Sequence, residues 1–170
     1  EAYAELSGTS YVGDVARYPN LVVLRTFSKW AGLAGLRVGY AVCHRELASR
    51  MMMIKQPYNV SVAGDVAARA AIAHRAEILE TVRCLITERE RLARELGAFS
   101  WLEPQPSEAN FVLVRVVGRP AQEVAAGLRR QGVLVRYYDR PNLRGYVRIS
   151  AGRPEDTDRL LAALRNLERT

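Results

Sequence analysis

Short apolar runs of strand length alternate along this chain with longer stretches in which apolar residues recur at helical spacing, and this alternation constrains the fold more than any other feature. The runs that we expect to form strands are residues 21–25, 37–42, 111–116, 133–137 and 146–150. The stretches that we expect to form helices are residues 46–54, 62–74, a long one that ends at Leu96, 120–130 and 154–167. Helices and strands in mixed order predict an α/β fold.

The long amphipathic helix separates two parts of different character. Its apolar residues form one stripe, its charges lie on the opposite face, and Gly97 provides a stop. The elements after it follow the order strand, helix, strand, strand, helix, so they can cover one another's apolar surfaces. We therefore expect residues 76–170 to form a small C-terminal α/β domain.

Residues 1–75 are predicted to be a portion of a larger domain. The two strands at 21–25 and 37–42 are continuous apolar runs, which need cover on both faces and are typical of a mainly parallel sheet. Their edges also need neighbouring strands. We expect those neighbours to come from a segment outside these 170 residues.

The charge of the chain points to small anions rather than to nucleic acid. The net charge is +7, and of the 25 basic residues only Lys29 and Lys55 are lysines. Arginine binds carboxylates and phosphates with two parallel hydrogen bonds. Because the arginines are interspersed with glutamates and no nucleic-acid-binding motif accompanies them, we expect no nucleic-acid partner. A basic, non-catalytic binding module is the alternative, and it rests on the net charge alone.

Several other classes of protein are disfavoured. No apolar stretch reaches the length of about 18 residues that a membrane span requires, and the acidic segment Glu1–Glu5 lacks the features of a signal peptide. Cys43 and Cys84 are too few for a disulfide framework, and His44 and His74 have no metal-ligand spacing with them. We expect a cytoplasmic protein without a membrane partner or a metal site.

The residues that carry chemistry lie around Lys29. This lysine stands in a glycine-bearing loop just after a buried strand, where ligands bind in α/β folds. Thr26 and Ser28 come just before it, and Arg37 follows where we expect the next strand to start. A lysine amine can attack a carbonyl, and hydroxyls with an arginine can hold a phosphate, so this set suits pyridoxal phosphate. Lys55 has no such neighbours and is interpreted as a surface residue.

The segment Ser28–Tyr40, which ends in Gly-Leu-Ala-Gly-Leu-Arg-Val-Gly-Tyr, resembles the lysine signature of fold type I pyridoxal-phosphate-dependent aminotransferases. It is most similar to the histidinol-phosphate aminotransferase family. The similarity continues through segments 1–3, 18–26, 56–60, 106–111 and 147–152, and so covers nearly the whole chain. The resemblance implies that residues 1–75 are the C-terminal portion of the family's large domain, and that the family's N-terminal half, with further cofactor contacts, is not part of this sequence.

The resemblance also implies how the cofactor would be bound. Lys29 would form the Schiff base with the cofactor aldehyde and later move a proton between the substrate and the cofactor. Tyr3 would hydrogen-bond the oxygen on the cofactor ring. Ser28, Arg37 and Thr26 would bind the cofactor phosphate.

Three further residues would contact the substrate according to the same resemblance. Arg148 would pair with an α-carboxylate, and Arg136 would bind the substrate's own phosphate. Asn59 would be a further substrate contact. Arg140 and Arg144 lie close to Arg136 in the sequence, so either could take the phosphate role instead.

The reaction implied is amino transfer between histidinol phosphate, an amino alcohol phosphate, and the 2-oxo acid 2-oxoglutarate, in histidine biosynthesis. Family members of this kind are homodimers, so a homodimer is expected here. Threonine-phosphate decarboxylation and amino transfer from aromatic amino acids are the alternatives, because all three chemistries use the same lysine.

Overall fold

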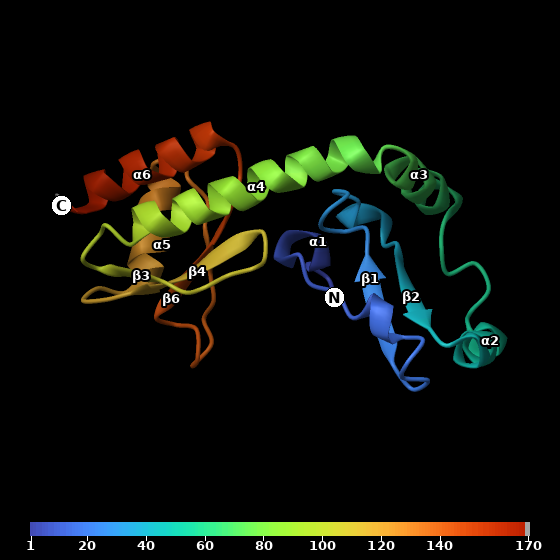
Figure 1. Cartoon of the computed structure of the whole chain (residues 1–170). Coiled ribbons are helices and arrows are strands. Elements are labelled where there is room, and N and C mark those ends of the chain that lie inside the picture. The colour runs from blue at the N-terminus through green and yellow to red at the C-terminus, as the bar shows by residue number, and fades with distance from the viewer. Residues whose placement is uncertain (169–170) are drawn as a thin grey trace. The chain divides into compact units, whose positions relative to one another are not determined.

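The computed structural model describes residues 1–168, which fall into two compact units, residues 1–82 and residues 83–168. The first unit contains the short helix α1 (Ala4–Ser7), the strands β1 (Val22–Thr26) and β2 (Gly39–Cys43), and the helices α2 (Arg45–Ile54) and α3 (Val62–Ala73) (Figure 1). The division between the units falls within the long helix α4 (Arg75–Leu96). None of the helices within residues 1–168 is long and apolar enough to cross a membrane.

Strands β1 and β2 form an antiparallel pair in the first unit, with Val22 opposite Cys43 and Thr26 opposite Gly39. The parallel arrangement expected of the larger sheet is therefore not present between these two strands. The reason is the connection, which holds only the 3₁₀ turn Ala34–Leu36 and no crossover helix.

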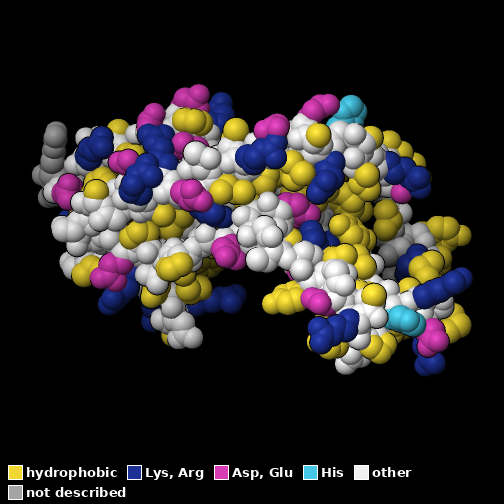
Figure 2. Space-filling model, viewed as in Figure 1, with side chains coloured by type: hydrophobic (Ala, Val, Ile, Leu, Met, Phe, Trp, Pro, Cys, Tyr) yellow, Lys and Arg dark blue, Asp and Glu magenta, His cyan; other side chains and the backbone are white. Residues whose placement is uncertain are grey.

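Helices α2 and α3 leave much apolar surface exposed. Helix α2 has no buried residue, and the Met53 and Ile54 side chains near its end are 79% and 84% exposed. Helix α3 begins at a Ser61 cap, whose side chain accepts a hydrogen bond from the Gly64 amide at 3.0 Å. Figure 2 shows apolar side chains on the visible surface over these two helices.

The second unit is built on a four-stranded antiparallel sheet in the order β3-β4-β6-β5. The strands are β3 (Leu102–Pro104), β4 (Phe111–Val116), β5 (Arg136–Tyr137) and β6 (Tyr146–Ser150). One face of the sheet packs on helices α5 (Ala121–Arg130) and α6 (Pro154–Glu168) and on the end of α4. The core between them contains Leu92, Leu96, Val112, Val114, Leu128, Val147, Ile149 and Leu164.

The expected order of elements in this half is confirmed, with two differences. Strand β3 was not expected, because three residues ending in a proline carry no apolar alternation. The strand expected over residues 133–137 is reduced to Arg136–Tyr137. Val133 and Val135 pack against the core, but they follow the turn at Gly132 (φ 76°) and only the last two residues reach a partner in β6.

Candidate functional site

The loop between β1 and β2 is held in a defined conformation by its own backbone and by buried aromatic residues. The Phe27 amide donates to the Val38 carbonyl at 3.1 Å, and the Leu33 amide donates to the Phe27 carbonyl at 3.1 Å. Phe27 and Trp30 are buried, and their ring centres lie 5.6 Å apart. Since Lys29 stands between these two anchors, its backbone position is fixed by the core of the unit.

Lys29 and Tyr3 come together in the structure. Lys29 is half-buried, and its Nζ lies 5.6 Å from the centre of the Tyr3 ring. Tyr3 directly precedes helix α1. The contact therefore joins two segments that the sequence pattern could not place side by side, and it puts a phenol next to a primary amine.

The hydroxyl groups on either side of Phe27 form one polar cluster. Thr26 Oγ1 donates to Ser28 Oγ at 2.9 Å, and the Ser28 amide donates back to Thr26 Oγ1 at 3.1 Å. This arrangement leaves the Ser28 hydroxyl proton available to an acceptor outside the pair. Two hydroxyls next to a lysine are a suitable donor set for a phosphate group.

The sequence pattern predicted that a strand begins at Arg37, and this prediction is wrong. Strand β2 begins two residues later, at Gly39. The backbone of Arg37 is left-handed, with φ 56° and ψ 41°, a conformation that costs a residue with a side chain about 1–3 kcal/mol. Its guanidinium is exposed and donates to the Ala34 carbonyl at 2.7 Å, and no carboxylate within residues 1–168 pairs with it. The charge of Arg37 is therefore available to an anion.

Gly39 explains why the strand begins where it does. A Cβ at position 39 would lie 2.7 Å from the Arg25 carbonyl oxygen, inside van der Waals contact. Only glycine lets β2 approach β1 at the root of the lysine loop.

We expect Gly39→Ala to lower the free energy of unfolding by about 1–3 kcal/mol, because the strands must separate to accept the methyl group. Urea denaturation of the chain would measure the loss. Gly35→Ala is the matched control, since a Cβ at position 35 meets no atom within 4 Å; its effect should stay within about 0.5 kcal/mol. Equal losses in the two variants would contradict the steric argument.

A second group of candidate residues lies on the outer face of the sheet in the second unit. Arg136 on β5 and Arg148 on β6 are directly opposite each other in the strand register. Their guanidinium carbons lie 5.1 Å and 5.9 Å from the centre of one ring, that of Tyr138, and Arg148 also lies 5.0 Å from the Phe111 ring.

Two like charges opposite each other destabilise a sheet unless an anion compensates them. No carboxylate within the described part of the second unit pairs with Arg136 or Arg148, and the buried Nε of Arg148 has no hydrogen-bond partner there. The aromatic contacts offset part of the repulsion. The arrangement is that of an anion-binding pair.

The neighbouring arginines differ from this pair. Arg144 donates to Asp139 Oδ1 at 2.8 Å, so its charge is already compensated. Arg140 is exposed and follows the end of β5. Among the three arginines considered for the phosphate role, Arg136 is the one that the register places opposite Arg148.

Asn59 lies on an exposed turn of the first unit, and its side-chain oxygen accepts a hydrogen bond from Lys55 Nζ at 2.9 Å. Its role in substrate binding stays a prediction. Lys55 is exposed, as expected of a surface residue.

One residue of the second group, Tyr138, was not singled out from the sequence. It carried a usable signal, because it follows Arg136 at the two-residue spacing that puts side chains on one face of an extended chain.

Comparison with known proteins gives consistent matches along the whole chain. The sequence model of the family "Aminotransferase class I and II" matches residues 1–164. A histidinol-phosphate aminotransferase from Dehalococcoides mccartyi is 50% identical over 164 residues, which cover 96% of this chain and 46% of that protein. The chain thus spans about half the length of the curated relatives that it matches.

Solved structures share the fold. The histidinol-phosphate aminotransferase from Sinorhizobium meliloti, crystallised in complex with pyridoxal-5'-phosphate, superposes with a TM-score of 0.84 and 31% identity over 99% of this chain and 47% of that one. An L-threonine-O-3-phosphate decarboxylase from Porphyromonas gingivalis gives a TM-score of 0.87 with 24% identity, over 100% of this chain and 54% of that one. The fold alone therefore does not separate amino transfer from decarboxylation.

Proposed function

Since the chain belongs to the aminotransferase class I and II family, we propose that it is a portion of a pyridoxal-phosphate-dependent enzyme that transfers the amino group of histidinol phosphate to 2-oxoglutarate. The observation that carries the proposal is the surroundings of Lys29. Its amine lies against the Tyr3 ring, the hydroxyls of Thr26 and Ser28 are next to it in the sequence, and Arg37 has no carboxylate partner within residues 1–168.

The donor set fits the cofactor. The phosphate of pyridoxal phosphate offers several acceptor oxygens to the Ser28 and Thr26 hydroxyls and to the Arg37 guanidinium. Lys29 would hold the cofactor through its amine and would move the proton at the substrate carbon that bears the amino group. Tyr3 would hydrogen-bond the cofactor. When bound, the cofactor supplies an electron sink for the charge that develops at the substrate α-carbon.

Arg136 and Arg148 recognise the anionic groups of the two substrates in this proposal. Arg148 binds the α-carboxylate of the 2-oxo acid and of the amino acid formed from it. Arg136 binds the phosphate of histidinol phosphate. The uncompensated charge of the pair and its shared contact with Tyr138 support an anion-binding role for both arginines. Asn59 is proposed as a further substrate contact.

Residues 1–75 belong, in this proposal, to a large cofactor-binding domain with a mainly parallel sheet, and residues 76–170 to a small domain. The first unit contains a hollow of about 890 Å³ lined by Phe27, Trp30, Val38 and Tyr40 among others. Trp30 Nε1 is buried and has no hydrogen-bond partner within the described residues. Further chain of the same domain would fill the hollow.

The enzyme is proposed to be a cytoplasmic homodimer in which each subunit helps to complete the other's site. The exposed apolar residues of helix α2 support this proposal, because such a surface is typically covered by a partner in the assembled protein. The mass of the full-length gene product in solution would test this part of the proposal.

The 170-residue chain alone is expected to bind pyridoxal phosphate weakly, because it offers one part of the contacts that the cofactor needs. A titration followed by the absorbance of the cofactor would measure the affinity. Tight stoichiometric binding by the isolated chain would show that the site is more complete than proposed.

The proposed reaction is tested on the full-length gene product with histidinol phosphate and 2-oxoglutarate. Formation of glutamate is the expected result. Release of carbon dioxide from threonine phosphate, without amino transfer, would instead assign the decarboxylase chemistry that shares this fold.

A further inference from the structure

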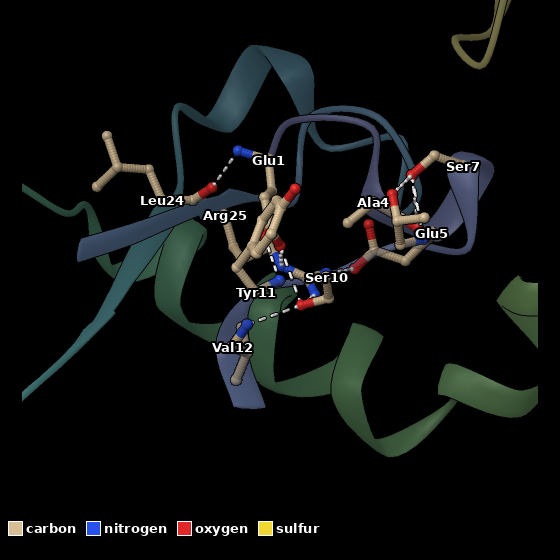
Figure 3. A network of polar contacts seen from close by, with 10 residues as sticks. Glu1, Ala4, Glu5, Ser7, Ser10, Tyr11, Val12, Leu24 and Arg25 are labelled. Carbon is tan, nitrogen blue, oxygen red and sulfur yellow. Dashed lines mark hydrogen bonds and ion pairs between the residues drawn. The ribbon is translucent and has the colours of Figure 1, made fainter. Parts of the chain in front are cut away.

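Strand β1, which leads into the Lys29 loop, carries an arginine that is largely buried. The side chain of Arg25 is 13% exposed and lies between two carboxylates (Figure 3). Its Nη1 donates to Glu5 Oε1 at 2.7 Å. Its Nε lies 2.9 Å from Glu1 Oε2, a contact that is an ion pair without hydrogen-bond geometry. Arg25 is thus engaged by two acids that are far from it in the sequence.

A second layer of polar contacts reinforces the pairing with Glu1. Ser10 Oγ accepts from Arg25 Nη2 at 2.9 Å and donates to Glu1 Oε2 at 3.1 Å, and the Tyr11 amide donates to Glu1 Oε1 at 2.6 Å. Burial raises the pKa of the Glu1 carboxyl, but the hydrogen bonds from Tyr11 and Ser10 and the charge of Arg25 outweigh it and hold the pKa below its ordinary value. The carboxylate is therefore charged at neutral pH.

The two acids bracket Tyr3. Glu1 stands two residues before it and Glu5 two residues after it, so both sides of the Tyr3 backbone are fastened to the same guanidinium. Arg25 lies four residues before Lys29 on one continuous stretch of chain. The strand that positions the lysine therefore also fixes the segment whose ring lies 5.6 Å from the lysine Nζ.

We propose that Arg25 is a positioning residue that fixes the Tyr3 ring against the Lys29 amine. Its function is to transmit the position of β1 to Tyr3 through Glu1 and Glu5. This inference rests on the proposed function, because the position of Tyr3 matters for the reaction only if the cofactor binds at Lys29. A surface ion pair would not have this role, since exposed pairs fix little.

The first test measures, without any cofactor, whether Arg25 holds the segment around Tyr3 in place through Glu1 and Glu5. Two variants of the 170-residue chain are compared. In Arg25→Lys, the lysine keeps the positive charge but cannot reach both carboxylates. In Glu5→Gln, the side chain keeps its shape but loses its negative charge. We expect the amides of Leu6, Ser7 and Gly8 to exchange with deuterium about tenfold faster or more in both variants, because local opening becomes easier. These amides donate to the carbonyls of Tyr3 and Ala4.

The matched control is Arg69→Leu, which removes an arginine of the same unit. Arg69 pairs with Asp65 on the surface of helix α3, and its side chain is 78% exposed. The exchange of the α1 amides should remain unchanged in this variant. Equal exchange in the Arg25→Lys variant and the unmodified chain would show that Arg25 does not hold the segment around Tyr3 in place.

The second test asks whether Arg25 acts through Tyr3. In the full-length gene product, Arg25→Lys should lower kcat about 10- to 100-fold, because the Tyr3 hydroxyl would be displaced by up to about 1 Å. The change in KM should be smaller. In a Tyr3→Phe background the same substitution should have little further effect, because the hydroxyl that it misplaces is absent. Equal losses in both backgrounds would overturn the role of Arg25. No amino transfer by the unmodified protein would overturn the proposed function instead.

Discussion

Lys29→Ala is expected to lower the rate of amino transfer by the full-length gene product about 10⁴-fold or more, because in the proposed function this one side chain both holds the cofactor and moves the proton. The backbone of the loop should be unaffected, since the buried Phe27 and Trp30 anchor it on either side. Initial rates with histidinol phosphate and 2-oxoglutarate would measure the loss.

Lys55→Ala is the matched control, because Lys55 is the second lysine of the chain and is exposed. Its rate should stay far above that of the Lys29 variant, because the substitution removes only the hydrogen bonds of an exposed side chain, one of them to Asn59. Reduction with borohydride in the presence of the cofactor should add the cofactor mass to the peptide that contains Lys29. A label on the Lys55 peptide would show that the assignment of the lysine is wrong.

Arg148→Ala is expected to weaken the carboxylate-bearing substrates, 2-oxoglutarate and glutamate. Removing one partner of a charged pair costs about 2–5 kcal/mol, which is a loss of about 30-fold to about 4,000-fold in kcat/KM. Histidinol phosphate has no carboxylate, so the half-reaction with this substrate should lose much less. Measuring the two half-reactions separately would reveal the difference.

Arg136→Ala should give the opposite pattern, with the larger loss for histidinol phosphate. The control for both variants is Arg115→Ala, because Arg115 lies on the same face of the sheet but already pairs with Glu103 at 3.0 Å. Its kcat/KM should be unchanged for every substrate. Equal losses for phosphorylated and carboxylate substrates in the Arg136 variant would contradict the division of roles between the two arginines.

Local pattern was sufficient for most of the elements. The apolar stripe and the stop at Gly97 predicted the end of α4 at Leu96, and the run of β-branched residues predicted β4 over Phe111–Val116. The apolar pattern did not predict where strand β2 begins. The run that begins at Arg37 has the composition of a strand, yet the strand starts at Gly39, because the left-handed backbone of Arg37 departs from extended geometry.

The sequence by itself predicted the residues of the candidate site: a lysine just after two hydroxyl residues, an arginine eight residues later, and a family signature around them. Only the tertiary structure decided which groups meet. It placed Tyr3 against Lys29, fastened Glu1 and Glu5 to Arg25, and set two arginines opposite each other. The physical reason is that periodicity records which face of a single element is buried. Contacts between elements depend instead on strand register and on loop closure, and these are fixed by packing among residues distant in the sequence.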